Sequence, residues 1–153
     1  MKNTIEKSIE LNVPIYRVWT ALTDSQQFGE WFKVSLIGPF VVDQKIHGQI
    51  THPGYEHIKC EAHVRKMEEP NYFSFTWHPY AIDETIDYAS ETPTLVEFNL
   101  EEKQASTLLT VIETGFDKVP NHRKKEAYEK HESGWSEQLE NIQNYLTNTN
   151  QIL

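Results

Sequence analysis

The chain has 153 residues, of which 38% are hydrophobic and 24% charged, a size and composition typical of one globular domain with its own core. Its 14 basic and 23 acidic residues give a formal net charge of -9. Because an acidic surface is repelled by phosphate backbones and anionic lipids, neither nucleic acid nor a membrane is expected as a partner. No apolar run approaches the about 20 residues of a membrane span, so we expect a single cytoplasmic domain over residues 1–153.

The N-terminal third predicts one strand and two short helices. Apolar residues alternate with polar ones from residue 4 to 13, with Lys7 as the exception, which indicates a half-buried strand. Pro14 suits the first turn of a helix. A second helix is expected to begin at Asp24 or Ser25. The apolar stripes of the two helices are Ile15, Val18, Trp19 and Leu22, and then Phe28, Trp31 and Phe32.

From Lys33 to Thr114 the helical period disappears and strands are predicted. The breaks between them contain turn residues such as Gly38-Pro39 and Pro70-Asn71. The last strand has apolar residues on both faces, so its inner face is left open. The predicted strands are Val34–Ile37, Lys45–Ile50, His57–Met67, Tyr72–His78, Thr94–Leu100 and Thr107–Thr114.

Helical spacing returns from about Pro120 to Thr147, and residues 148–153 are expected to be a frayed tail. A helix of this length spans about 40 Å and is the largest element that could cover one face of the sheet. We therefore predict an α+β fold in which a curved antiparallel sheet grips a long C-terminal helix, with an apolar pocket between them. The apolar face of the helix contains Tyr128, Trp135, Leu139, Ile142 and Leu146.

Bulky flat side chains gather on the elements that face this interior. Such residues form either a plain aromatic core or the lining of a pocket for a small apolar molecule, and the sequence allows both. The predicted pocket residues are Trp31, Phe75, Trp77, Tyr80, Phe98, Val111, Glu113, Gly134, Trp135 and Leu139.

Two of these residues are unusual at their positions. Glu113 shares a strand face with Leu109 and Val111; it is either a buried carboxylate with a functional role or a solvent-exposed residue at the strand end. Gly134 lies within the predicted long helix, where glycine costs about 1 kcal/mol relative to alanine. Two explanations, which are compatible, are that the helix backbone approaches the sheet closely there and that the missing side chain leaves room for a ligand.

No metal site, other cofactor or catalytic motif is predicted. The seven histidines do not have the spacing of a zinc site. The single cysteine, Cys60, lies in a predicted strand and is expected to be a buried, inert thiol. The loop from Pro79 to Pro93 carries four carboxylates without the spacing of a calcium loop: Asp83, Glu84, Asp87 and Glu91. We interpret this loop as a lid or rim at the pocket mouth.

Short motifs are spread along nearly the whole chain: Val13-Pro14, Val18-Trp19, Leu22-Thr23, Trp31-Phe32, Phe75-Thr76-Trp77, Thr94-Leu95-Val96-Glu97-Phe98, Glu113-Thr114-Gly115-Phe116 and Gly134-Trp135. In this order they resemble the motifs of START-like (SRPBCC) proteins. More narrowly, they resemble the family named after the C-terminal domain of the activator of the heat-shock chaperone ATPase. The resemblance implies a helix-grip fold with a central cavity, in a superfamily of lipid and polyketide binders, cyclases and bacterial stress proteins.

Three functional hypotheses follow from the residues and the resemblance. The first is non-catalytic binding of a small apolar or aromatic molecule, such as a lipid, polyketide or flavonoid, in a stress-related role. The second is a co-chaperone or protein-interaction module with a chaperone as partner. The third is an enzyme of cyclase or hydrolase type that uses Glu113 and the loop carboxylates.

Overall fold

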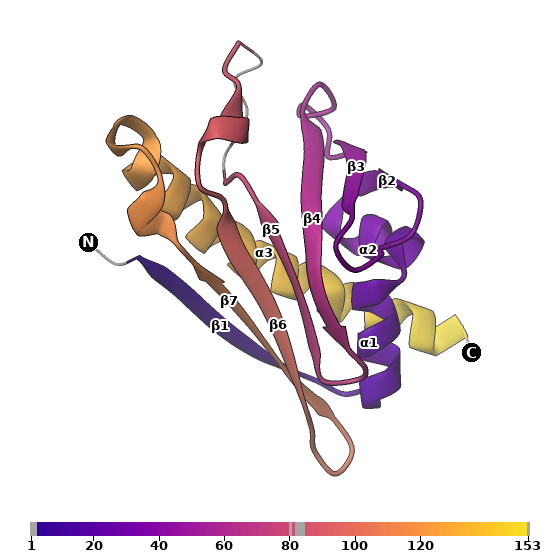
Figure 1. Cartoon of the computed structure of the whole chain (residues 1–153). Helices are drawn as coiled ribbons and strands as arrows, with labels where there is room; N and C mark the ends of the chain where they lie inside the picture. Colours follow the sequence, from indigo (N-terminus) through magenta and orange to yellow (C-terminus); the bar gives the residue numbers. More distant parts are fainter. Residues whose placement is uncertain (1–2, 80, 82–84, 153) are drawn as a thin grey trace.

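The computed structural model describes residues 3–79, 81 and 85–152. Its elements follow the predicted order of a strand, two short helices, six strands and a long helix (Figure 1). Short 3₁₀ turns lie at Tyr88–Ser90 and Phe116–Lys118. The strands and helices are β1 (Thr4–Leu11), α1 (Ile15–Thr23), α2 (Ser25–Phe32), β2 (Val34–Ile37), β3 (Lys45–Ile50), β4 (Lys59–Glu68), β5 (Tyr72–Trp77), β6 (Thr94–Glu102), β7 (Thr107–Thr114) and α3 (Asn121–Ile152).

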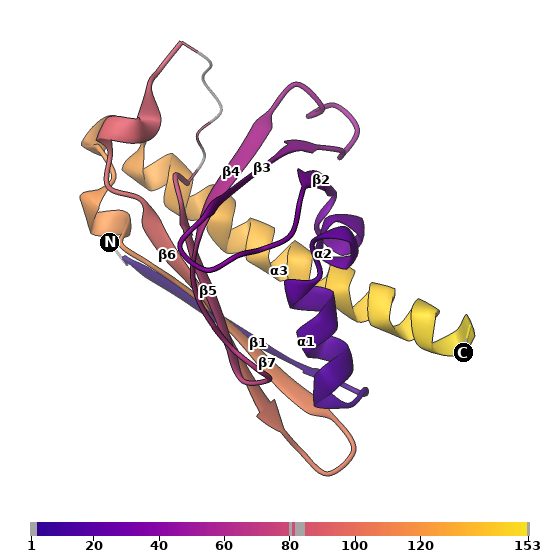
Figure 2. The ribbon, with the colours of Figure 1, turned by 45° about the vertical axis from the view of Figure 1, so that its right-hand side comes forward.

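The strands form one antiparallel sheet of seven strands in the order β1-β7-β6-β5-β4-β3-β2. Strands β2 to β7 therefore form a meander, and β1 pairs with the outer edge of β7. Figures 1 and 2 show the curved sheet around α3, with α1 and α2 beside the C-terminal half of that helix. This is the predicted α+β helix-grip arrangement, and it places the long helix against the inner face of the sheet.

The inner face of the sheet supplies much of the core, and the structure decides which face of β7, left open by the sequence, points inward. Leu109 and Val111 are fully buried, whereas Leu108 and Ile112 are only half-buried on the opposite face. Because Val111 lies opposite the buried Phe98 of β6, the odd-numbered residues of β7 point inward. Glu113 belongs to that set.

Several boundaries differ from the predicted ones. Pro14 is the N-cap of α1, not a residue of its first turn. Strand β4 begins at Lys59, since Ile58 closes a turn by donating its N–H to the Tyr55 carbonyl. Strand β5 ends at Trp77, and β6 continues to Glu102, which pairs with Thr107. Helix α3 continues to Ile152, beyond the point where a frayed tail was expected.

Candidate ligand-binding site

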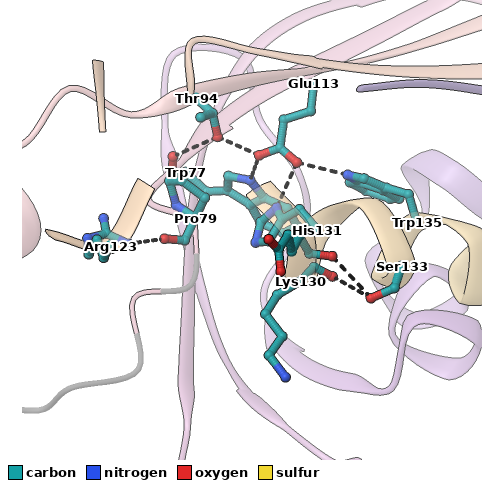
Figure 3. A network of polar contacts seen from close by, with 10 residues as sticks. Trp77, Pro79, Thr94, Glu113, Arg123, Lys130, His131, Ser133 and Trp135 are labelled. Atoms are coloured by element: carbon teal, nitrogen blue, oxygen red, sulfur yellow. Dashed lines mark hydrogen bonds and ion pairs between the residues drawn. The ribbon is translucent and has the colours of Figure 1, made fainter. Parts of the chain in front are cut away.

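Glu113 is the centre of a buried polar network at one end of the core (Figure 3). Its Oε2 accepts hydrogen bonds from Trp77 Nε1 at 2.8 Å and from Thr94 Oγ1 at 2.5 Å. Its Oε1 accepts hydrogen bonds from Trp135 Nε1 at 2.9 Å and from His131 Nδ1 at 2.7 Å. The solvent-exposed alternative for Glu113 was therefore wrong, because its side chain is 0% exposed.

Three strands and one helix bring these groups together. Trp77 is the last residue of β5 and lies directly opposite Thr94, the first residue of β6. Glu113 extends from the neighbouring strand, β7. His131 and Trp135 are four residues apart in α3, a spacing that places them on the same face of a helix. The network therefore fastens α3 to the end of the sheet.

The contacts of Glu113 keep it ionised although it is buried. Burial by itself raises the pKa of a carboxyl group. Here the attraction of His131 and the hydrogen bonds from His131, Thr94 and Trp77 outweigh that effect, and the pKa of Glu113 lies below its ordinary value. A carboxylate has about four lone-pair positions, so the four donors occupy all of them.

A pocket of about 110 Å³ adjoins this network. The indole rings of Trp77 and Trp135 stack with centroids 5.9 Å apart, and the Phe32 ring lies 6.0 and 6.1 Å from them. These three rings form an aromatic wall of the pocket, and two of them are the indoles that donate hydrogen bonds to Glu113. The complete lining is Phe32, Trp77, His131, Gly134, Trp135 and Gln138.

Gly134 leaves this pocket open on the helix side. No described atom outside the local helix backbone lies within 4 Å of the position that a Cβ would occupy. The close approach of the helix backbone to the sheet, which was one explanation for this glycine, is therefore wrong. The other explanation, that the missing side chain leaves room beside α3, agrees with its place in the pocket lining.

The remaining predicted pocket residues are distributed elsewhere. Trp31, Phe75, Phe98 and Val111 are at most 2% exposed and do not line this pocket. The rings of Trp31, Phe75 and Phe98 pack against neighbouring rings, with Phe75 and Phe98 centroids 6.0 Å apart. These three residues and the buried Val111 therefore form core. Tyr80 lies outside the described residues. Among the described members of the predicted set, only Trp77, Gly134 and Trp135 line the pocket, with Glu113 behind them.

Leu139 lines a separate and larger surface groove of about 460 Å³ between β1 and α3. Five of its seven lining residues are polar or charged, and Ile9 and Leu139 are apolar. The groove includes none of the residues that contact Glu113, and we assign the candidate site to the smaller aromatic pocket. The other groove residues are Lys7, Ser8, Ser136, Glu140 and Gln143.

The loop that was interpreted as a lid is fastened to the start of α3. The Arg123 guanidinium donates hydrogen bonds to the Pro79 carbonyl and to the Glu91 carboxylate, and it lies 4.8 Å from the centroid of the Tyr88 ring. None of the described loop residues lines the aromatic pocket. Of the loop carboxylates, residues 83 and 84 lie outside the described part of the chain.

The described part of the chain was also searched for metal sites, a reactive thiol and membrane-spanning helices. No group of three or more His, Cys, Asp or Glu side chains there could hold a metal ion. Burial raises the pKa of the Cys60 thiol to about 11, so it is protonated and a weak nucleophile near neutral pH. Within the same residues, no helix has the length and apolarity needed to cross a bilayer.

Sequence reasoning missed four of the residues that build the site. Phe32 was assigned to a helix stripe, and Thr94, His131 and Gln138 were not selected. The usable signal was the spacing on α3, since His131 precedes Trp135 by one turn and Gln138 follows Gly134 by one turn. A histidine on the apolar face of a helix opposite an inward-pointing glutamate indicates a buried pair.

Comparison with family models matches residues 12–147 to the family described as activator of Hsp90 ATPase homolog 1-like protein. The chain belongs to this family. The match includes every element of the site, from Phe32 to Gln138. It also supports the sequence-based resemblance to the wider START-like superfamily. Comparison with curated proteins found no significant match.

Solved structures show the same fold at low sequence identity. MLL2253 from Mesorhizobium loti has a TM-score of 0.75 and 20% identity over 95% of this chain and 98% of its own. The Aha1 dimer from Colwellia psychrerythraea has a TM-score of 0.71 and 14% identity over 95% and 96%. DynU16, a protein in the dynemicin biosynthetic locus, has a TM-score of 0.74 and 17% identity over 96% of this chain. The matched part is only 48% of the length of DynU16.

Proposed function

We propose that this chain is a non-catalytic, cytoplasmic binding protein for a small apolar molecule, with a ring-sized part of that molecule inserted beside Gly134. The observation that carries the proposal is the pocket of about 110 Å³ with Phe32, Trp77 and Trp135 as its wall. Three aromatic rings and a missing side chain make a concave apolar surface, the usual chemistry of a small-molecule site.

The size of the pocket limits the ligand. Sites for drug-sized molecules are about 300–1,000 Å³, whereas this one is about 110 Å³. A pocket of this order suits a single ring, because an apolar cavity of about 150 Å³ binds benzene. A larger lipid, polyketide or flavonoid would therefore insert one ring or chain end and leave the rest outside the pocket.

The proposal can be tested with NMR titrations that follow the indole N–H signals. Trp77 and Trp135 line the pocket and donate to Glu113, whereas Trp31 donates to the Ala21 carbonyl at 2.8 Å within the core. Toluene and naphthalene should shift the Trp77 and Trp135 signals while the Trp31 signal changes little. Absence of saturable shifts with any apolar probe would contradict the proposal.

A pair of leucine substitutions separates pocket binding from non-specific contact. Gly134→Leu places a side chain into the pocket and should abolish the shifts. Ser133→Leu adds the same side chain at the neighbouring position, which is exposed, and should leave binding unchanged. Equal binding by both variants would show that the probes bind elsewhere.

A second candidate function is protein interaction, as in a co-chaperone. Exposed apolar side chains lie on β2 and the segment after it: Ile37 is 78% exposed, Val41 40% and Val42 42%. Apolar side chains gathered on a surface are typical of protein contacts. In a direct assay the purified chain should then raise the ATPase rate of purified Hsp90, and Ile37→Asp should reduce that effect.

The third hypothesis, an enzyme with Glu113 as general acid or base, gains no support from the contacts of that carboxylate. A general base must have a lone pair within reach of the proton that it abstracts. Both oxygens of Glu113 already accept two hydrogen bonds each. We therefore propose a structural role for Glu113 in which it holds the two indoles of the pocket wall.

A further inference from the structure

Phe32 is the part of the pocket wall that the N-terminal helices supply. It is the last residue of α2, whereas the other lining residues belong to β5 and α3. The pocket therefore lies at the joint between α2 and α3, which are in contact (Figure 2). The separation of these two helices limits the size of a ligand that fits between Phe32 and the indoles.

Gln138 of α3 closes this joint with a directional contact. Its Nε2 donates a hydrogen bond to the Phe32 carbonyl at 3.1 Å, and its Oε1 accepts one from Asn141 Nδ2 at 3.1 Å. A carbonyl in the last turn of a helix has no partner within that helix, so Gln138 caps α2 from α3. Because Gln138 also lines the pocket, the same side chain bounds the space and holds the Phe32 side of the wall.

The peptide group between Phe32 and Lys33 is fixed at both of its polar atoms. Its carbonyl accepts from Gln138, and its N–H, on Lys33, donates to the Gly29 carbonyl at 2.9 Å. Lys33 has a φ of 69° and a ψ of 54°, a left-handed conformation that a non-glycine residue keeps only where its surroundings hold it. The Phe32 ring stacks on Phe28 with centroids 4.9 Å apart. The contact with Gln138 therefore holds the Phe32 ring at its place in the wall.

We infer that Gln138 determines ligand size, because its hydrogen bond to the Phe32 carbonyl keeps the pocket closed to molecules wider than one ring. A single ring suits the closed pocket of about 110 Å³. A fused pair of rings enters fully only when α2 and α3 separate, which breaks the hydrogen bond and leaves a part-buried carbonyl without its partner. The inference rests on the proposed binding function and names the residue that limits its ligand class to single rings.

The test compares the affinities of toluene and naphthalene, measured from the Trp77 and Trp135 indole signals. Gln138→Met keeps the length of the side chain and removes its donor. Gln138→Glu keeps a polar group that, when ionised, only accepts hydrogen bonds. In both variants, separation of the helices no longer breaks a hydrogen bond to the Phe32 carbonyl. The ratio of naphthalene affinity to toluene affinity should therefore rise about threefold to tenfold above that of the wild type.

The matched control is Gln143→Met, because Gln143 is exposed on the same helix and lines the separate groove. Its affinity ratio should equal that of the wild type. An unchanged ratio in both Gln138 variants would overturn the inference and leave apolar binding intact. A rise in Gln138→Met without a rise in Gln138→Glu would also overturn it, since the polarity of the wall would then be responsible.

A milder variant decides if neither Gln138 variant folds. Asn141→Ala removes the donor to Gln138 Oε1 and should raise the affinity ratio about twofold, because Gln138 is then held less firmly. An unchanged ratio in Asn141→Ala would overturn the inference. No saturable shift with either probe in the wild-type protein would contradict the binding function itself.

Discussion

The interior of this protein has two regions with opposite chemistry. In the first, Phe73, Phe75 and Phe98 pack together at centroid distances of 5.8 to 6.0 Å and are at most 2% exposed. In the second, Glu113 and its donors form a buried charged network beside a pocket. Phe98 and Trp135, whose centroids are 5.7 Å apart, connect the two regions.

The two regions contribute differently to the stability of the fold and to the geometry of the pocket. Apolar packing stabilises the fold in proportion to buried area and does not depend on one particular partner. A buried carboxylate adds little net stability, but it requires all of its donors in fixed positions. The aromatic region therefore sets the stability of the fold, and the polar region sets the geometry of the pocket wall.

The largest loss of stability is expected from a substitution in the apolar region. Phe98→Ala should lower the free energy of unfolding by about 3–5 kcal/mol, because it removes a fully buried ring and leaves a cavity. The loss should be the same at neutral and acidic pH, since no ionisable group is changed. Urea unfolding measures it, and Phe98→Leu, which keeps most of the volume, should cost less than about 1.5 kcal/mol. A loss for Phe98→Ala that disappeared in acid would contradict this division of roles.

A smaller effect is expected in the polar region from Glu113→Gln. The amide keeps the shape, but its NH₂ group faces two donors, so the free energy of unfolding should fall by about 1–3 kcal/mol. The matched control is Glu97→Gln, where Tyr72 Oη donates to a half-buried carboxylate on the outer face of the sheet and can donate equally to an amide oxygen. That change should stay within about 0.5 kcal/mol. If the two variants lost similar free energies of unfolding, the Glu113 network would be no more sensitive to its donors than a hydrogen bond on the outer face of the sheet.

The pH dependence of protein stability tests the role of the Glu113 charge. Because the folded-state pKa of Glu113 lies below its ordinary value of 4.5, its stabilising contribution is complete above that value and is lost as the pH falls through the lowered folded-state pKa. The wild type should therefore lose more stability in acid than Glu113→Gln, and the difference between their urea midpoints should shrink below pH 4.5. A difference that stays constant through this window would show that the Glu113 charge is not responsible.

The smallest effect is expected at Gly134, with the opposite sign to the effect at another helix glycine, Gly29. Gly134→Ala should raise stability by up to about 1 kcal/mol, because alanine favours the helix and the added Cβ meets open space. Gly29→Ala in α2 should lower stability, since its Cβ would lie 2.3 Å from the Val34 carbonyl oxygen. Thermal melts of the two variants measure both changes. Destabilisation by Gly134→Ala would place that position against the sheet after all.

The sequence predicted the strands and helices well where one face of the element is buried and the other is exposed to solvent. The alternation in β6 and the apolar stripe of α3 follow directly from that asymmetry. It failed at places where a contact with a distant segment decides the outcome. Glu101 and Glu102 do not look like strand residues, yet they continue β6 because they pair with Leu108 and Thr107.

For the candidate site, the sequence by itself determined two aromatic side chains of the wall, Trp77 and Trp135, and the unusual positions of Glu113 and Gly134. Tertiary structure alone decided that Glu113 turns inward, since β7 is apolar on both faces and only its pairing with β6 fixes which face meets α3. It also decided that Thr94 and His131 join the same carboxylate, from residues 19 and 18 positions away. A buried charge is tolerated only where such donors converge, and that convergence depends on how the sheet curves around the helix.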